Sequence, residues 1–578
     1  MFKNTKHLLL LPLRFHPIPA YFSQAPINWA YPPSPSSIFL LLFFLPYFKS
    51  IHSLLQPTSL SSGSVTLSWL MSAKSNLWSV RSVRLRVAMA VALALTIEGL
   101  MRSNLNMAIV CMLNSTALTD GKPMISATSS RLNTSFNEEK CPLLTFGGNK
   151  TVEHRGTIYW TSHDRAIIFA AFYVGGLVAT LCSELLNRYI GPTRTVFYGA
   201  VVNVLGTFVT PFVASTTNFG TMPIMFLRFL MGFGQGVLWP CMLVLVSQWF
   251  PANEKSTALA IATTGNQLSV VIAMFATAEL CQLPLGWPMA FHTYAVFGIV
   301  LCVLWYIVVH DSPCHAEDVL SKEELHYITT ERAIKRPQKT RWLNLAKSPV
   351  VWSIAASSFA HNYVTVGTIT YLPLYYKTIL NMSLTSNGVL SALPFLLQLI
   401  SKVVYVGFAD IARRREWASM DTITKICNSS ASFGIAICFG LLCFADCTQR
   451  GTAIFLVCMA MSFVSGYIPG YSTSVVTIAP AQTAGIAAFS RFWGQIASSV
   501  APYHIGAFTK QGTPAEWMSV FSTMGAICIA TGVFFHCCGT VSLQHWDSDH
   551  SKAPIEIARE ELIDSSKLDD SLRITTVD

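Results

Sequence analysis

Charged residues are scarce in this sequence. Asp, Glu, Lys and Arg make up 12% of its 578 residues, about half the share in a soluble protein, whereas hydrophobic residues make up 52%. The mean hydropathy is +0.46, and the apolar residues fall in runs of about twenty, the length that a helix needs to cross a bilayer. This composition excludes an ordinary soluble domain and predicts an all-α membrane protein embedded in the lipid bilayer.

The sequence also lacks the signatures of several functional classes. It holds no CxxC pair with zinc-site spacing and no recognisable nucleophile–base or metal constellation, so we expect neither an enzyme, a metal site nor a cofactor. Fifteen cysteines are present, but about half lie inside apolar runs, where cysteine acts as a small hydrophobe, and no disulfide framework is expected. The early apolar run from Leu8 to Leu11 is closed by Pro12, so no signal peptide is expected.

The net charge of +10 does not indicate nucleic-acid binding. Many of the positive residues lie in short loops between apolar runs, where they set the orientation of a membrane protein, so no nucleic-acid partner is expected. Four of them precede the first confident span and predict a cytoplasmic N-terminus: Lys74, Arg81, Arg84 and Arg86.

The apolar runs predict twelve transmembrane helices in two groups of six. The first group falls at about 87–113, 166–186, 196–214, 223–250, 257–280 and 288–309. The second falls at about 350–372, 388–408, 423–444, 453–471, 485–508 and 517–538. The predicted domains are a poorly structured extension at 1–85, a six-helix bundle at 86–310, a cytoplasmic linker at 311–348, a second bundle at 349–543 and a disordered cytoplasmic tail at 544–578.

Two independent signals agree on the topology. An even number of spans puts both termini on one side, and the basic residues of the loops that follow spans two, four and eight then face the cytoplasm, as the positive-inside rule requires. Four N-x-S/T sequons fall in loops on the opposite side, where glycosylation occurs: Asn114, Asn133, Asn149 and Asn381.

The fourth span contains both a charge and a glycine stripe. Arg228 is followed by Gly232, Gly234 and Gly236. A charge inside a span costs about 2.5–3.5 kcal/mol on insertion scales, and small residues at close spacing let helix backbones approach one another. The combination predicts a pore or a substrate pathway beside this helix.

The two halves share a weak internal repeat. Glu184 and Arg188 follow the second span, and Asp410 and Arg413 follow the eighth. Two six-helix halves with this charge pattern resemble the plan of the major facilitator superfamily, in which substrate binds at the midplane between the halves. The resemblance implies that these four residues are gating charges whose ion pairs hold one state closed. Orientation by the positive-inside rule is the alternative for the arginines.

Longer motifs are similar to those of solute carrier family 17, the anion transporters that include sialin and the vesicular glutamate transporters. The motifs are Arg102–Val110 in the first span, Arg228–Pro240 in the fourth and Gln248–Ser256 in the loop after it. Gln235 stands where the family usually has a titratable Glu, so the chain is identified as a divergent member. The resemblance implies a secondary active transporter of an organic or inorganic anion, a carboxylate or phosphate, that works by alternating access.

The resemblance also suggests residues for the anion site. Arg102 and Arg228 would bind the anionic group, because guanidinium offers a planar fork of donors and stays charged; structural pairing or snorkelling is the alternative. Gln235 would bind substrate or neighbouring helices. His361, with a reference pKa of ~6.5, would either sense pH or pack as a neutral polar residue, and Tyr363 would line the same pocket.

Two further ionisable groups complete the set. Arg491 is either a third anion contact or the partner of an unidentified residue. Glu98 lies four residues before Arg102 on one helical face, where it would either neutralise Arg102 or take over the titratable role missing at Gln235. The coupling ion would be a proton or sodium, and the membrane the plasma membrane or a vesicular or lysosomal one. The rival function is a transporter-like protein that no longer transports and acts as a sensor or partner-binding module.

Overall fold

The computed structural model describes residues 82–114, 156–215, 220–251, 254–313, 320, 324–325, 327–328, 342–480, 482–544 and 546. They belong to one compact unit, Ser75–Asp578. Within them the regular structure is helical, apart from one isolated bridge between Leu113 and Ile158. The sequons at Asn133 and Asn149, and most of the predicted extension and tail, lie outside the described residues.

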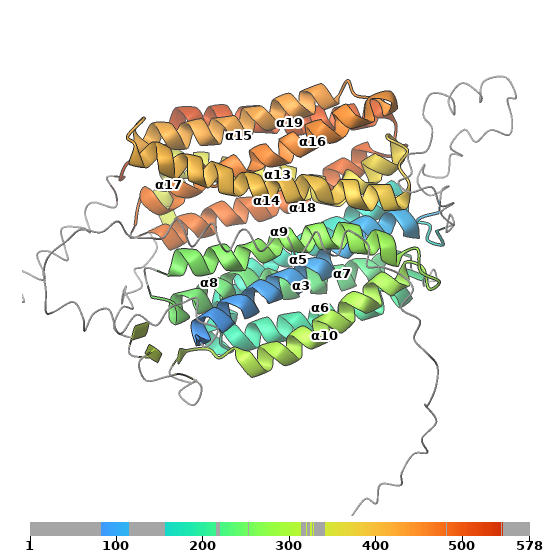
Figure 1. Ribbon diagram of the computed structural model, residues 1–578, viewed down its shortest axis with the longest axis horizontal. Helices are drawn as coiled ribbons and strands as arrows, with labels where there is room; N and C mark the ends of the chain where they lie inside the picture. The colour runs from blue at the N-terminus through green and yellow to red at the C-terminus, as the bar shows by residue number, and fades with distance from the viewer. Residues whose placement is uncertain are drawn as a thin grey trace, which may run out of the picture. The chain divides into compact units, whose positions relative to one another are not determined.

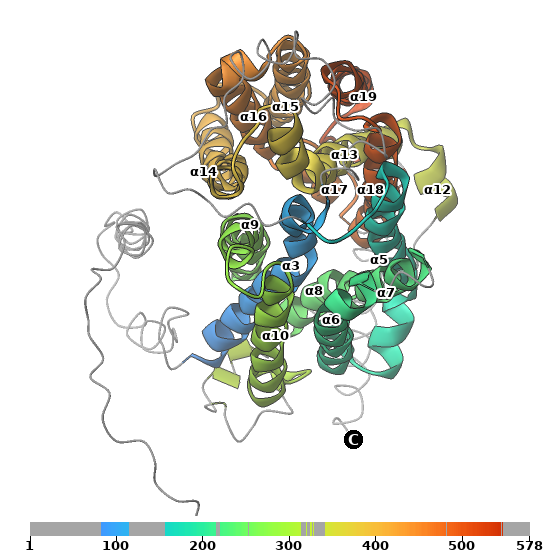
Figure 2. The same cartoon turned by 90° about the vertical axis from the view of Figure 1, so that its right-hand side faces the viewer.

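The helices form two groups on either side of a common boundary (Figure 2). The first group, here called the N bundle, comprises α3 (Val83–Met112), α5 (Ser162–Tyr189), α6 (Pro192–Ser215), α7 (Met222–Gly236), α8 (Leu238–Trp249), α9 (Lys255–Leu280) and α10 (Pro288–Val308). The C bundle comprises α13 (Pro349–Thr378), α14 (Leu384–Arg414), α15 (Met420–Leu442), α16 (Arg450–Val464), α17 (Tyr471–Thr477), α18 (Thr483–Phe508) and α19 (Pro514–Cys538), preceded by the short α12 (Trp342–Lys347). Figure 1 shows that the axes of the long helices are roughly parallel.

Nine of the described segments are long and apolar enough to cross a membrane. Helices α3, α13 and α18 are as long, at 30, 30 and 26 residues, but more polar. The membrane-protein class is therefore confirmed, whereas the full number of twelve spans stays a prediction. The predicted fourth span is divided into α7 and α8 at Val237. Pro240 follows three residues later and cannot donate to the carbonyl of Gly236, which weakens the helix at this point.

The glycine stripe of α7 is a packing seam inside the N bundle. A Cβ at Gly232 would lie 1.7 Å from the carbonyl oxygen of Phe172 on α5. One at Gly234 would lie 2.7 Å from the carbonyl oxygen of Gly199 on α6. Real Cβ atoms do not approach backbone this closely, so only glycine permits these contacts. The stripe thus joins helices of one bundle, and the expectation of a pore or a substrate pathway beside this helix stays a prediction.

The two ends of the bundles are packed differently. We call them the Leu113 end and the Arg84 end, after the end and the beginning of α3. At the Leu113 end one apolar cluster includes residues of both bundles, among them Leu113, Phe169, Tyr371 and Met382. At the Arg84 end the described apolar residues of the N bundle form a cluster of their own, and a small C-bundle cluster around Ala412 is separate from it. The bundles are therefore closed against each other at the Leu113 end.

Polar contacts support this closure. Gln282, at the end of α9, donates from Nε2 to Oγ1 of Thr385 on α14 at 2.8 Å. The hydroxyl of Ser162 on α5 donates to the carbonyl of Lys510, just after α18, at 3.2 Å. Both bonds join residues of different bundles.

A disulfide joins Cys111, in the last turn of α3, to Cys281, at the C-cap of α9. The expectation of no disulfide framework is therefore wrong. Cys111 lies inside the predicted first span, in its last helical turn, where α3 and α9 meet with Cα atoms 6.5 Å apart. The 170 residues between the two cysteines hide this proximity in the sequence. Cys447 is disulfide-bonded as well.

Candidate functional site

Arg102 lies on α3 at the contact with α9. Its Nη2 donates to Oδ1 of Asn266 at 3.1 Å, and its Nε is buried without a hydrogen-bond partner among the described residues. The two helices approach closely here because glycine stands at two contacts. A Cβ at Gly99 would lie 2.1 Å from Oγ of Ser269, and one at Gly265 would lie 2.3 Å from the carbonyl oxygen of Ala92. These glycines bring the Asn266 amide within reach of Arg102.

Glu98 does not form the expected ion pair with Arg102. Its side chain is 3% exposed, and both carboxyl oxygens have no hydrogen-bond partner among the described residues. The guanidinium of Arg102 is turned toward α9, because Asn266 offers an acceptor there. Glu98 lies within electrostatic range of Arg102 and of Cys302 on α10, in the interior of the N bundle.

Arg228 is buried inside the N bundle, with an exposed fraction of 2%. Its Nε and Nη2 have no hydrogen-bond partner in the described part of the chain. Gln235 lies about two turns further along α7 and is partly exposed. A buried guanidinium without an acid partner is costly, and its free donors could bind an anionic oxygen.

Two cations of the C bundle reach across the boundary between the bundles. The guanidinium of Arg491, on α18, stacks over the ring of Trp239 on α8, 4.7 Å from the ring centroid. The ammonium group of Lys402, on α14, donates to Oγ1 of Thr263 on α9 at 3.4 Å. Lys402 was not predicted as a site residue. It is a charge in the middle of an apolar span, so the criterion that selected Arg228 also applies to it.

His361 belongs to the same group of residues. Its Nδ1 is 3.1 Å from the hydroxyl of Tyr471, and its ring stacks on Tyr467 at a centroid distance of 5.2 Å. Lys402 lies within electrostatic range of His361, and Arg491 within range of Tyr471. The structure thus connects Lys402, His361 and Arg491 on the C-bundle side of the boundary.

Tyr363 is placed differently from His361. It is buried, and its hydroxyl is 2.7 Å from Nδ1 of His504 on α18. Two positions along a helix correspond to a rotation of about 200°, so the two side chains leave α13 on different sides. The structure does not bring Tyr363 to His361, and its proposed contact with substrate stays a prediction.

The four predicted gating residues lie at the Arg84 end. Glu184, Arg188, Asp410 and Arg413 are all exposed. Within the described residues, the ion pairs involve only Arg84 and Lys425 as cations, so the four do not pair with one another here. Their gating role stays a prediction.

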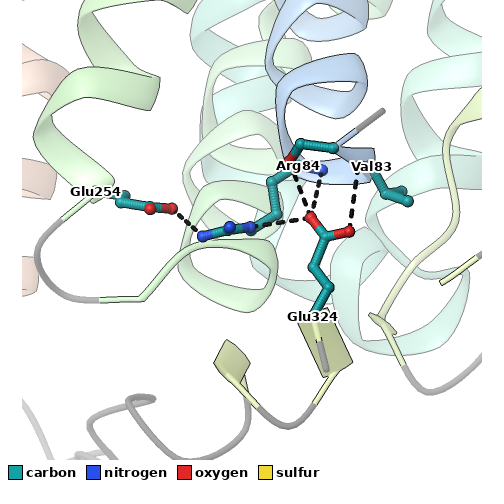
Figure 3. A network of polar contacts seen from close by, with 5 residues as sticks. Val83, Arg84, Glu254 and Glu324 are labelled. Atoms are coloured by element: carbon teal, nitrogen blue, oxygen red, sulfur yellow. Dashed lines mark hydrogen bonds and ion pairs between the residues drawn. The ribbon is translucent and has the colours of Figure 1, made fainter. Parts of the chain in front are cut away.

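An ionic network at the Arg84 end was not predicted. The buried Arg84 side chain forms ion pairs with Glu254, before α9, and with Glu324 of the linker (Figure 3). Its Nε is 3.0 Å from Oε1 of Glu324, whose carboxylate also accepts from the hydroxyl of Ser82 at 2.9 Å. The ring of Tyr327 lies 4.8 Å from the guanidinium. Arg84 therefore ties the linker to the start of α3, in addition to any role in orientation.

Of the four sequons, the structure describes two. Asn114 donates from Nδ2 to the hydroxyl of Tyr159 at 2.8 Å, and Asn381 follows α13 with a φ of 48°. Both lie at the Leu113 end, next to Leu113, Leu380 and Met382 of the shared apolar cluster. Their modification stays a prediction.

Residues 91–502 match the Major Facilitator Superfamily, and the chain belongs to this superfamily of membrane transporters. Its relatives include members of solute carrier family 17, the family that the motifs of this chain resemble. Human sialin is 26% identical over 476 residues, which is 81% of this chain and 92% of sialin. The mouse sodium-dependent phosphate transport protein 3 is 25% identical over 454 residues, 78% of this chain and 92% of that protein.

Other comparisons agree with this assignment. A protein of Caenorhabditis elegans, named uncharacterized transporter slc-17.3, is 29% identical over 493 residues, 82% of this chain and 91% of that protein. Among solved structures, a D-xylose–proton symporter has a TM-score of 0.55 at 13% identity, covering 78% of this chain and 98% of the symporter. The chain is therefore a multi-pass integral membrane protein of transporter fold, and the expectation that it is not an enzyme is confirmed by its family.

Proposed function

We propose that the protein is a secondary active transporter of a small organic or inorganic anion, a carboxylate or phosphate, and that it works by alternating access. One observation carries the proposal. Arg102, Arg228, Lys402 and Arg491 form no ion pair within the described residues, although each is buried or lies at the boundary between the bundles. Cations left without acids in a membrane protein are costly, and a bound anion would offset that cost. Relatives named for phosphate and glutamate support the substrate class.

The Arg84 end is proposed to face the cytoplasm, together with both termini. The basic loops around Arg188 and Arg413 lie at this end, as the positive-inside rule requires. The disulfide between Cys111 and Cys281 lies at the opposite end, and disulfides persist in oxidising compartments outside the cytoplasm. Closure at the Leu113 end then corresponds to a state open toward the cytoplasm. The membrane is the plasma membrane or a vesicular or lysosomal one.

Transport requires that the bound anion changes the relative stability of two states, one closed at the Leu113 end and one closed at the Arg84 end. Ligands shift a conformational equilibrium only through different affinities for its states. An anion that contacts Arg102 on the N bundle and cations of the C bundle at once would favour a state in which the bundles also meet at the Arg84 end. Release would return the molecule to the arrangement described above.

Glu98 is the proposed site of proton coupling. A buried carboxylate without a hydrogen-bond partner costs far more free energy than the neutral acid. Arg102, on the same helix, and Cys302 of α10 both lie within electrostatic range of Glu98. A substrate anion that draws the charge of Arg102 away from Glu98 would favour protonation of Glu98, so proton and anion would move together.

The test is uptake by proteoliposomes that hold the full chain. Phosphate, glutamate, sialic acid and urate are supplied in turn under a pH gradient, a sodium gradient or a membrane voltage. We expect accumulation of at least one of these anions. Arg102→Gln should reduce anion uptake about 10- to 100-fold, which corresponds to the free energy of one or two charged hydrogen bonds. Arg86→Gln, at an exposed position of the same helix, should leave uptake unchanged. No uptake under any driving force would overturn the proposal and favour a sensor or partner-binding protein.

A second variant tests the coupling. Glu98→Gln removes the titratable group and keeps its size, so anion uptake should continue but lose its dependence on the pH gradient. Unchanged pH dependence in Glu98→Gln would exclude Glu98 as the coupling residue. Dependence on a sodium gradient alone would assign the coupling to sodium.

A further inference from the structure

One turn of α9 holds two cations from different bundles. Asn266 accepts from Arg102 of α3 at 3.1 Å, and Thr263, three residues earlier, accepts from Lys402 of α14 at 3.4 Å. Residues three apart on a helix are neighbours on its surface, with Cβ atoms about 5–6 Å apart. Arg102 and Lys402, one cation from each bundle, are therefore bound by neighbouring residues of α9.

The acceptors that hold these cations are neutral. An amide oxygen and a hydroxyl carry no charge that could neutralise Arg102 or Lys402. The Arg84 network shows the contrast, because there a buried arginine lies between two carboxylates, Glu254 and Glu324. The buried Arg84 is thus neutralised by acids, whereas the described partners of Arg102 and Lys402 are neutral.

Both cations also keep unused donors. Lys402 has three N–H donors and, among the described residues, a single long hydrogen bond, to Thr263. Arg102 has five donors, of which Nη2 binds Asn266 while Nε has no partner among the described residues. Anionic oxygens form shorter and stronger hydrogen bonds to such donors than neutral oxygens do. An anion at this position would therefore displace Thr263 and Asn266 as the preferred partner.

The charge of the fitting anion follows from the number of cations. A single negative charge would neutralise one of the two and leave the other unpaired, whereas two negative charges would neutralise both. Lys402 and Thr263 are partly exposed and belong to different bundles, so an anion bound there would contact both bundles at once.

We propose that Arg102 and Lys402 form a two-cation clamp, and that Lys402 makes the transporter selective for a small dianion. The class comprises dicarboxylates and phosphate in its doubly charged form. This inference rests on the proposed function and adds a binding residue and a substrate charge to it.

The test compares anions that differ in charge, in proteoliposomes that hold the full chain. Uptake of succinate is measured against butyrate, and uptake of phosphate is measured at pH 6 and pH 8, where its singly and doubly charged forms dominate. The two arms distinguish a dicarboxylate from phosphate as the source of the dianion. The wild type should take up succinate, or phosphate at pH 8, at least tenfold faster than the singly charged form.

Three variants test the residue itself. Lys402→Gln keeps a donor for Thr263 but loses the charge, and should reduce the ratio of dianion to monoanion uptake at least tenfold. Lys402→Arg keeps the charge and should retain a third or more of the wild-type ratio. Lys425→Gln removes a lysine that is paired with Asp421 at the Arg84 end, and should leave the ratio unchanged. The ratio is an internal measure, so a lower yield of folded protein does not affect it.

The outcomes separate the two proposals. An unchanged ratio in Lys402→Gln, or equal losses for dianion and monoanion, would overturn the clamp. Wild-type uptake of monoanions alone would also overturn it while leaving anion transport intact. Absence of all anion uptake would overturn the proposed function, and the clamp with it.

Discussion

The two ends of this molecule are held by different forces. At the Leu113 end a continuous apolar cluster crosses between the bundles, together with hydrogen bonds between neutral groups. At the Arg84 end the strongest described contacts are the ion pairs of Arg84, which stay between the N bundle and the linker. Opening the Leu113 end would expose apolar surface to water, which costs about 25 cal/mol of free energy per Å². Charge thus stabilises one bundle internally, while apolar packing decides where the bundles meet.

The largest expected effect lies at the Arg84 end. Arg84→Gln leaves two carboxylates without their buried cation, and removal of one partner from a buried ion pair costs about 3–5 kcal/mol. We expect the free energy of unfolding in detergent, measured by denaturant titration, to fall by that amount. Arg86→Gln, exposed on the same helix, serves as the control and should change it by less than about 0.5 kcal/mol.

A loss of under about 1 kcal/mol in Arg84→Gln would contradict this account, because surface ion pairs have that value. The triple variant Arg84→Met, Glu254→Leu, Glu324→Leu removes all three charges. It should recover most of the lost stability, because apolar residues of similar size replace buried ion pairs at little cost.

A smaller effect is expected at the Leu113 end. A Cβ at Gly506 of α18 would lie 2.5 Å from the Cβ of Ala166 on α5, in the opposite bundle. Gly506→Leu should therefore act as a wedge that prevents closure, and reduce anion uptake about tenfold. Labelling of Ser162→Cys, a buried position at this end, by an impermeant maleimide should increase in the wedged variant.

Gly451 provides the matched control for the wedge. It lies at the same end, at the start of α16, but no atom lies within 4 Å of the position of its Cβ. Gly451→Leu should leave uptake within twofold of the wild type. Equal losses in both glycine variants would show that bulk at this end, rather than closure between the bundles, limits transport.

The smallest effect concerns an ion pair within one helix, between Lys425 and Asp421 of α15. Lys425 and Asp421 lie 3.2 Å apart, one turn from each other on α15, and both are partly exposed. Lys425→Gln should lower the free energy of unfolding by about 0.3–0.5 kcal/mol. A loss above about 1.5 kcal/mol would mean that charge at the Arg84 end stabilises the fold wherever it occurs, and would weaken the contrast between the two ends.

Much of the fold could be predicted from the sequence, because a membrane span is determined by the residues of its own segment. A run of apolar residues marks a helix without knowledge of its neighbours. The division of the fourth span at Val237 was missed, since Pro240 alone does not reveal whether a helix bends or breaks there.

The site was predicted less completely, because its contacts depend on packing between helices. Arg102 could be identified, but its partner Asn266 lies on another helix and is brought close by glycines at the helix contact. Glu98 and Arg102 show the limit of reasoning on one helix, because suitable spacing did not produce an ion pair. Lys402 could have been predicted as a site residue, since the criterion applied to Arg228, a charge inside an apolar span, also selects it.

The disulfide at the Leu113 end has a mechanical consequence. It joins α3 to α9, and both helices belong to the N bundle. Together with the close packing at Gly99 and Gly265, it makes the two helices one rigid unit that is covalently joined at the Leu113 end. Arg102 and Asn266 both belong to this rigid unit, so the distance between them stays the same during the conformational change. Lys402 and Thr263 belong to different bundles, so the distance between them measures how far the bundles have moved relative to each other.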